Sequence, residues 1–284
     1  MVQKILNKIE SKRKSEELIW KFLVFIKDIL WHILFFIKTK ILYYFLYLLE
    51  YPYKKIMRSR IKNYIEKKYT IEFITASHKS DILNKYLLKS KIFEKYKLIV
   101  QKNFTNVPKA YNEANSQADI KIYIHHDVYL PNDFEENLLY SIYKIEKKDK
   151  NWGVLGVMGV IAISDINIKS YGNLTSGGGY CHYGIKFPQP VDTLDELILI
   201  TKKKFVFDEK VGNHFYGADI CLQAKESGMK NYTIDAFLNH ASDTSSLGIA
   251  ADFWVSRKYI KEKYEHLLPI ATTCTIIPKV DNKN

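Results

Sequence analysis

The stretch "IKIYIHHDVYLP", residues 120–131, decides the fold of this chain. Its first half is an apolar run typical of a strand, and its second half places two histidines and an aspartate just before a proline. Because side chains alternate faces along a strand, His125 and Asp127 are expected on one side and His126 on the other. The pattern allows two interpretations, a buried strand with a hydrogen-bonded polar tip or a strand that ends in a metal and phosphate site.

Short β-rich runs alternate with polar helical segments before this stretch. Strands are expected at 69–76, 97–101 and 120–125, and helices at 81–90 and 109–116. A βαβαβ series predicts a parallel sheet with helices on both faces. Ligands of such sheets bind beyond the carboxyl ends of the strands, which is where His125 and Asp127 would lie.

The chain continues in the same alternating pattern after Pro131. Asn132 as N-cap and the acidic Glu135 and Glu136 in the first turn predict a helix that reaches about Lys147. Residues 153–163 read as another buried strand. The glycines at 177–179 indicate a mobile loop, either a surface excursion or an active-site lid.

Composition and charge distribution separate a basic N-terminal head from a near-neutral body. The 284 residues are 47% hydrophobic, enough for a packed core, and the net charge is +12. Residues 1–68 hold 16 Lys and Arg against 6 Asp and Glu, whereas the other residues hold 27 against 25. The domains expected are therefore a head over 1–68 and an α/β domain over 69–284. The neutral body argues against a nucleic-acid partner.

The head has the pattern of a helix that lies in a membrane interface. Residues 18–49 are rich in Leu, Ile, Phe, Trp and Tyr, but charged residues interrupt them before the run of about 18 that a membrane span needs. A broad apolar face remains, and basic residues within 12–60 would add about 1 kcal/mol each of attraction to anionic lipid. The alternative is a helical hairpin packed on the body or on a second copy, in a homo-oligomer.

The cysteines and the N-terminus indicate a cytoplasmic protein. Cys181, Cys221 and Cys274 are far apart and form no CxxC pair, so neither a disulfide framework nor a zinc knuckle is expected. The first residues lack the pattern of a removable signal peptide.

Five segments together resemble a known enzyme family. They are "ITASHKS" (74–80), "KAYNEANSQAD" (109–119), "YIHHDVYLP" (123–131), "FDEKVGNHFYGADICLQAKESG" (207–228) and "NHAS" (239–242). In this order they are similar to family-2-type glycosyltransferases with a GT-A fold, most closely to the StrF-like branch of streptomycin biosynthesis. The resemblance covers about residues 69–245 and leaves out the head.

The resemblance implies a cation site at the strand end. An Asp-x-Asp motif in the family binds the sugar-nucleotide diphosphate through Mn²⁺ or Mg²⁺. Here His125 takes the first acidic position and Asp127 the second, and an imidazole with a carboxylate could hold such a cation. His240 would be a further metal ligand or phosphate contact, or it only caps a loop.

The resemblance also assigns a base and substrate contacts. Asp219, after Ala218, would be the general base that deprotonates the acceptor hydroxyl; alternatively it only stabilises a helix end. The donor contacts implied are Thr75, Ala76, Ser77, Asn103, Lys109 and His126. The acceptor or sugar contacts implied are Asp192, Asp195 and Tyr216, of which the two aspartates could equally be solvated turn residues.

The function expected is a metal-dependent, inverting glycosyltransferase. It would move a sugar from a nucleotide-diphosphate donor, with UDP-sugars favoured, to a glycan or lipid-linked acceptor. A bacterial enzyme of surface polysaccharide synthesis, peripheral at the inner face of the cell membrane, would fit the head. The alternative is a catalytically inactive sugar- or nucleotide-binding protein, because His125 and Ala218 stand where the family has acids.

Overall fold

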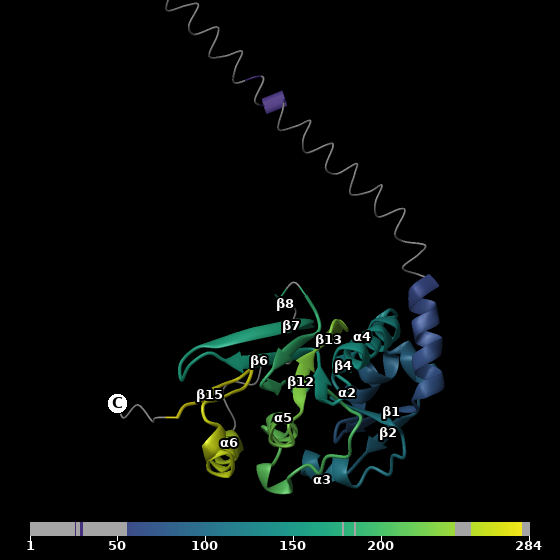
Figure 1. Ribbon diagram of the computed structural model, residues 1–284. Coiled ribbons are helices and arrows are strands. Elements are labelled where there is room, and N and C mark those ends of the chain that lie inside the picture. The colour runs from purple at the N-terminus through teal and green to yellow at the C-terminus, as the bar shows by residue number, and fades with distance from the viewer. Residues whose placement is uncertain are drawn as a thin grey trace, which may run out of the picture. The chain divides into compact units, whose positions relative to one another are not determined.

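The computed structural model describes residues 26, 29, 30, 56–177, 179–184, 186–241 and 251–279 (Figure 1). The chain divides into two compact units, residues 1–57 and 58–284. In the first unit residues 26, 29 and 30 are helical, and the rest of the predicted membrane face lies outside the described residues. Among the residues that are described, no helix is both long and apolar enough to cross a membrane.

The second unit is built on a seven-stranded mixed sheet. Its first three strands, β1 (Ile71–Ala76), β2 (Leu98–Gln101) and β3 (Ile120–Ile124), are parallel, as predicted. Two other strands, β5 (Trp152–Gly156) and β12 (Lys230–Thr233), are also parallel to each other. Strand β11 (Ile198–Thr201) lies between β3 and β5 and is antiparallel to both, and β9 (Gln189–Val191) is antiparallel to β12. The order is β2-β1-β3-β11-β5-β12-β9.

The central strands are buried on both faces. Ile122 and Ile124 of β3 and Ile200 of β11 have no exposed surface, so these strands read as nearly continuous apolar runs rather than as an alternation. Ile74, Tyr123 and Leu199 pack in one core with residues of three helices, α3 (Val107–Asn112), α5 (Tyr216–Glu226) and α6 (Ala251–Lys263). Helix α4 (Phe134–Lys148) lies on the other side of the sheet (Figure 1). The predicted α/β fold with helices on both faces is confirmed.

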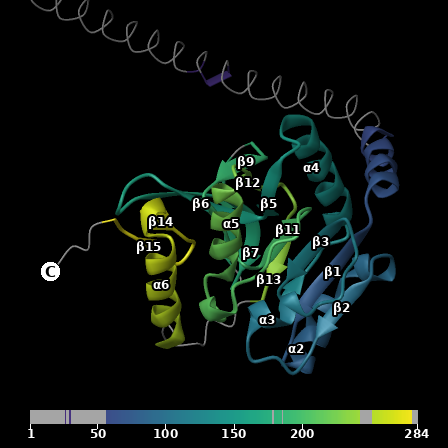
Figure 2. The same cartoon turned by 60° about the horizontal axis from the view of Figure 1, so that its bottom comes forward.

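Five helices are described with their bounds in this unit. They are α2 (Ser80–Lys85), α3 (Val107–Asn112), α4 (Phe134–Lys148), α5 (Tyr216–Glu226) and α6 (Ala251–Lys263). The helix predicted over 81–90 ends at Lys85 and continues as short 3₁₀ turns at Leu87–Lys89 and Lys91–Glu94. Helix α6 lies beside α5 (Figure 2). Helix α4 is close to the prediction, although its N-cap is Asp133 and not Asn132.

A second sheet covers the edge of the first at the carboxyl end of β3. Its path is β10-β6-β7-β13-β4, with β8 paired to β7. The strands are β4 (Val128–Tyr129), β6 (Met158–Ala162), β7 (Ile168–Ser176), β8 (Gly179–Tyr183), β10 (Thr193–Leu194) and β13 (Leu238–His240). A small hairpin, β14 (Ile270–Ala271) and β15 (Ile276–Ile277), completes the described strands.

Two predictions about the middle of the chain are wrong in detail. The strand predicted over 153–163 is two strands, β5 and β6, which belong to different sheets. The break falls at Val157, so the chain passes from one sheet to the other there. The loop predicted at 177–179 is the turn of the β7–β8 hairpin, in which Ser176 pairs with Gly179.

Residues 58–68 are helical and belong to the body, whereas the sequence placed them in the head. Lys62 Nζ lies 2.6 Å from Glu135 Oε2, and the rings of Tyr64 and Tyr143 meet edge to face, so this helix contacts α4. At its end Lys68 Nζ and the Tyr69 hydroxyl both donate to Glu146 Oε2. Trp152 Nε1 and Lys202 Nζ donate to Glu146 Oε1, each at 2.7 Å. Glu146 therefore joins the helix, α4 and the sheet.

Replacing Glu146 is expected to destabilise the fold in a pH-dependent way. Burial raises the pKa of this carboxyl, but the bonds from Lys202, Tyr69, Trp152 and Lys68 outweigh it and lower the pKa to about 2. A depressed folded-state pKa gives stability that is present above the unfolded value and lost on acidification. Glu146→Gln should cost about 1.5–3 kcal/mol in urea unfolding at neutral pH, and the difference from wild type should shrink near pH 3.

Glu136→Gln is the matched control on the same helix. Glu136 is partly exposed and its Oε1 lies 3.4 Å from Arg58 Nη1 at the surface, so this change should cost less than about 1 kcal/mol. A Glu146→Gln deficit that is equally large at acid pH would contradict the assignment.

Candidate active site

Three side chains form a cluster at the carboxyl end of β3. One ligand atom from each of His125, Asp127 and His240 lies within 4.8 Å of the others. Asp127 Oδ2 is 3.2 Å from His240 Nε2, and Asp127 Oδ1 is 3.8 Å from His125 Nδ1. All three side chains are partly exposed. Two imidazoles and one carboxylate at these distances form a set of ligands that could bind a metal cation.

Backbone pairing brings the three residues together. After β3 the chain turns at residues 125–127 and enters β4, which pairs antiparallel with β13 so that Val128 faces His240. Ala241 N donates to Asp127 O at 3.0 Å, and His125 N donates to Leu197 O at 3.1 Å. The pairing of β4 with β13 therefore brings Asp127 and His240 together, although they are far apart in the sequence.

Both histidines of the cluster are oriented by a second hydrogen bond. His125 Nε2 lies 2.7 Å from the Tyr216 hydroxyl of α5, and His240 Nδ1 lies 3.0 Å from Ser176 Oγ of β7. The other ring nitrogen of each histidine is thus directed toward Asp127. Metal-binding histidines characteristically have this kind of partner on the second nitrogen.

The residues of the cluster fit a divalent cation. Asp127 Oδ1 is buried and has no hydrogen-bond partner among the described residues, and a bound cation would supply the missing interaction. Burial raises the pKa of Asp127, but the His240 hydrogen bond and the nearby histidines lower it to about 2. Burial lowers the pKa of His125, against the charge of Asp127. An ionised carboxylate and a neutral imidazole are the forms that bind a metal.

A pocket of about 260 Å³ opens beside the cluster. Its lining comes from the ends of β1 and β3, from the start of α3 and from the start of α5. The lining residues are Ala76, His78, Val107, Tyr111, His125, His126, Asp127, Asn213 and Tyr216. His126 bonds Ser77 Oγ at 3.0 Å and packs on the His78 ring, whereas His125 and Asp127 face the cluster. His125 and Asp127 thus share a side as predicted, although residues 125–127 form the turn after β3 rather than part of the strand.

The other predicted donor residues lie at different places. Thr75 is fully buried in β1, and its hydroxyl has no hydrogen-bond partner among the described residues. Asn103 follows β2 and has a φ of 64°, a left-handed conformation that asparagine tolerates. Lys109 does not line this pocket, and its ammonium lies 3.9 Å from Glu113 on the surface of α3.

The two predicted acceptor aspartates are separated in the structure. Asp192 accepts from Ala162 N and from Lys225 Nζ, so it has structural partners away from the cluster. Asp195 accepts from Thr273 Oγ1 at 2.6 Å and from Leu197 N at 3.1 Å. Its charge acts to raise the pKa of His125. Asp195 is therefore the aspartate of the pair that lies near the cation cluster.

The expected catalytic role of Asp219 has no support in the structure. Its side chain has no exposed surface, although it stands in the first turn of α5. Oδ1 accepts from Lys263 Nζ at 2.6 Å and from the Tyr264 hydroxyl at 2.7 Å, and Oδ2 accepts from Gln223 Nε2 at 2.7 Å. Asp219 is turned toward α6 and connects the two helices, which leaves it closed to a substrate.

Glu196 was not among the predicted site residues. Its side chain is partly exposed and contacts the start of α5, although it belongs to another segment of the chain. It stands in "TLDELILI" (193–200), just before β11. Glu196 Oε1 accepts from Gly217 N at 3.3 Å. The adjacent acids before an apolar strand were the available signal, but only the antiparallel insertion of β11 beside β3 brings them to His125.

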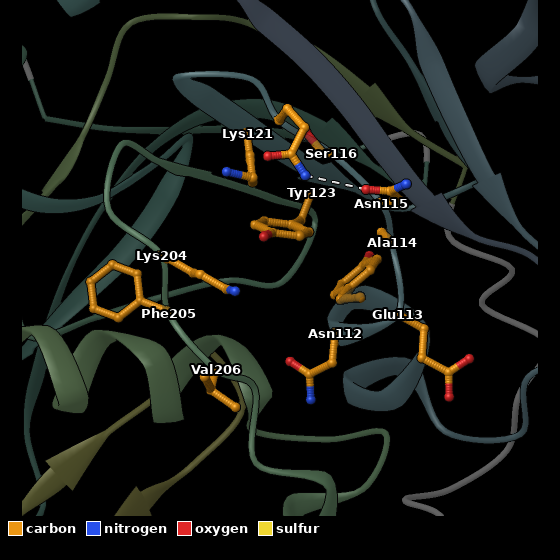
Figure 3. A pocket seen from close by; sticks show the side chains of 12 residues that line it. Asn112, Glu113, Ala114, Asn115, Ser116, Lys121, Tyr123, Lys204, Phe205 and Val206 are labelled. Atoms are coloured by element: carbon orange, nitrogen blue, oxygen red, sulfur yellow. Dashed lines mark hydrogen bonds between the residues drawn. The ribbon is translucent and has the colours of Figure 1, made fainter.

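A larger pocket of about 550 Å³ shares Tyr111 with the first but contains none of the cluster residues. It lies between the segment that follows α3, the start of β3 and residues 204–206 (Figure 3). Lys121, Lys204, Asn112 and Glu113 are at its edges (Figure 3). Size favours this pocket, but the convergence of ligand atoms favours the smaller one as the active site.

Sequence comparison identifies the family. Residues 72–265 match a family described as "Glycosyltransferase like family". The match spans more than half of the chain, which therefore belongs to this glycosyltransferase-like family. The matched residues include the cation cluster, Glu196 and all of α5.

Individual relatives are distant. A Fuscovulum blasticum protein described as "ATP synthase subunits region ORF 6" is 30% identical over 164 residues, which cover 52% of this chain and 60% of that protein. The solved mannosyltransferase PcManGT from Pyrobaculum calidifontis, in complex with GDP-Man and Mn²⁺, is similar with a TM-score of 0.42 and 9% identity over 70% of this chain and 62% of that one. S. aureus TarS 1–349 is similar with a TM-score of 0.45 and 12% identity over 68% and 65%.

Removing the Asp219 carboxylate is expected to lower stability. Asp219→Asn would leave Lys263 with one carboxylate partner, Asp208, and would place an amide beside a half-buried ammonium. We expect a loss of about 2–3 kcal/mol in urea unfolding. Asp235→Asn is the control, because Asp235 is exposed and accepts a hydrogen bond from Asn173. Equal stability of the two variants would contradict the structural role.

Proposed function

We propose that this protein is a metal-dependent glycosyltransferase whose cation is held by His125, Asp127 and His240. The observation that carries the proposal is the convergence of three ligand atoms around a buried carboxylate oxygen without a hydrogen-bond partner, next to a pocket at the strand ends. Membership of a glycosyltransferase-like family supports it. Mn²⁺ suits a set of two imidazoles and one carboxylate better than Mg²⁺, which prefers oxygen ligands.

The donor is a sugar joined to a nucleoside diphosphate. The bound cation would neutralise the diphosphate as it departs. On the protein side, Ala76 and His78 line the pocket and Ser77 bonds His126; these residues and Asn103 after β2 would contact the nucleoside. We favour a UDP-sugar, inverted at the anomeric carbon, and the StrF-like branch as the nearest group. Tyr216 and Asp195 would contact the sugar or the acceptor.

Nucleotide binding tests this proposal directly. Calorimetric titration of UDP, GDP and CDP, each with Mn²⁺, should give metal-dependent binding of one nucleotide to the wild type. Asp127→Ala should weaken that binding at least about tenfold, because loss of a metal ligand removes the cation that joins protein and diphosphate. Asp133→Ala is the control, since Asp133 is exposed and lies at the start of α4.

Two results of this titration would count against the proposal. Binding that is as strong in Asp127→Ala as in the wild type would remove the cation site from the mechanism. Failure of all three nucleotides to bind the folded wild type would remove the donor. Metal-dependent binding without any turnover would favour the alternative of a catalytically inactive binding protein.

The acceptor is proposed to be a glycan or a lipid-linked glycan at the inner face of a bacterial membrane. The support is the basic, aromatic composition of residues 12–60, nearly all of which lie outside the described residues; self-association through this segment is the competing arrangement. The full chain should float with anionic phospholipid vesicles at low salt and less at high salt. Replacing Lys12, Arg13 and Lys14 by Gln should reduce flotation, and unchanged flotation would argue against this electrostatic contact.

A further inference from the structure

Glu196 lies where the chain crosses between the two sheets. Residues 195–197 connect β10 of the second sheet to β11 of the main sheet. Leu197 O accepts from His125 N at 3.1 Å, so the crossing runs directly beside the end of β3. Glu196 is therefore one residue away from the backbone partner of a predicted cation ligand.

The carboxylate of Glu196 points at the N-terminus of α5. Gly217 N donates to Glu196 Oε1 at 3.3 Å, and the N–H groups of Phe215 and Tyr216 also face this carboxylate. Phe215 has a φ of 64°, an uncommon conformation for an aromatic residue that shapes this helix start. Backbone N–H groups at a helix N-terminus stabilise negative charge.

The sequence of α5 leaves room for this carboxylate. A Cβ atom at Gly217 would lie 2.8 Å from Glu196 Cγ and 3.1 Å from Leu194 O, so glycine at 217 and glutamate at 196 are mutually adapted. Glu196 is partly exposed, whereas Asp219 in the same helical turn is fully buried and bonded to Lys263 and Tyr264. The partly exposed carboxylate at the start of α5 is therefore that of Glu196, which belongs to the segment before β11.

Tyr216 connects this carboxylate to the cation cluster. Its backbone N–H faces Glu196, and its hydroxyl lies 2.7 Å from His125 Nε2. A donor whose diphosphate is bound at the cluster would place its sugar near the start of α5. Tyr216 lines the pocket, and Glu196, which is partly exposed, accepts from Gly217 N next to it, so an acceptor hydroxyl that comes from the side of the α5 N-terminus would approach this carboxylate.

We propose, on the basis of the glycosyl transfer proposed above, that Glu196 is the catalytic base of this enzyme and takes the role that the sequence suggested for Asp219. The acceptor oxygen forms a bond to the anomeric carbon of the sugar. The bond from that carbon to the phosphate oxygen breaks, and its electron pair leaves with the nucleoside diphosphate. The hydroxyl proton of the acceptor passes to the Glu196 carboxylate.

The surroundings of Glu196 suit proton transfer near neutral pH. Burial and the charge of Asp195 raise its pKa to about 8, although the N–H groups of Gly217, Phe215 and Tyr216 act to lower it. A base with a pKa close to the working pH is the most effective. The titratable groups that face it are Asp195 on its own segment, Tyr216 and Cys221 on α5, Tyr111 on α3, and Cys274 in the turn between β14 and β15.

The test combines turnover, pH dependence and nucleotide binding in Glu196→Gln. Release of nucleoside diphosphate from UDP-glucose, UDP-galactose and GDP-mannose is measured with Mn²⁺, and the donor that the wild type uses fastest is taken further. Wild-type kcat should rise with pH to a plateau above about pH 8, because only the ionised carboxylate accepts a proton. Glu196→Gln should lower kcat about 100-fold or more and abolish this rise, while calorimetric nucleotide affinity stays unchanged.

Two further variants separate a chemical role from a structural one. Glu196→Ala combined with Gly217→Asp should recover part of the activity that Glu196→Ala loses, because a carboxylate from position 217 would enter the space that Glu196 leaves. Glu226→Gln, at the exposed end of α5 beside His266, should keep the wild-type rate and pH profile. A Glu196→Gln enzyme with an intact pH-dependent kcat would overturn the assignment.

The outcomes distinguish failure of this proposal from failure of the proposed function. A wild type that binds nucleotide and turns over the donor, together with an active Glu196→Gln variant, overturns the base and leaves the transferase. A wild type that binds no nucleotide, or binds without turnover, overturns the transferase and the base with it.

Discussion

The antiparallel pairing of β11 with β3 is the constraint on which the rest of the site depends. It inserts a strand between the three parallel strands β2-β1-β3 and the parallel pair β5-β12 of the main sheet, with Ile198 opposite Ile124 at the carboxyl end of β3. The chain must therefore arrive at this edge from the second sheet, which brings residues 195–197 against His125. On the other side the turn after β3 leaves for β4 and meets His240 on β13. The positions of the cation cluster and of the Glu196 carboxylate therefore both depend on how the chain leaves β3 and how it enters β11.

Local sequence patterns were sufficient to predict the elements of the first half. The apolar runs of β1, β2 and β3 and the acidic first turn of α4 are local signals. Each depends on the propensity and burial of a few neighbouring residues. His125 and Asp127 do face the same cluster, but they lie in the turn after β3, so strand alternation is not what places them there. The prediction for 153–163 failed because a continuous apolar run does not reveal where a strand passes from one sheet to another.

The candidate site shows the same division between local and distant causes. Asp219 was predicted as a base from its position in a helical first turn, but the direction of its side chain is decided by Lys263 and Tyr264, more than forty residues later. Glu196 was missed because nothing near it in the sequence reports the start of α5. Its relation to Gly217 is visible only when the two segments are brought together. A sequence motif located the cluster, and tertiary contacts decide which carboxylate is open.

Phe215 has a left-handed backbone conformation that contacts from α6 help to hold, so the start of α5 depends on a later part of the chain. A non-glycine residue in this conformation costs about 1–3 kcal/mol and persists only when surrounding contacts hold it. One such contact is the Phe253 ring of α6, whose centroid is 4.8 Å from that of Phe215. Lys263 and Tyr264 hold the first turn of α5 through Asp219. During synthesis the strands of the two large sheets and the cation ligands leave the ribosome before α6 does. The start of α5 that faces Glu196 therefore acquires its final shape only late, after Tyr264 has been made.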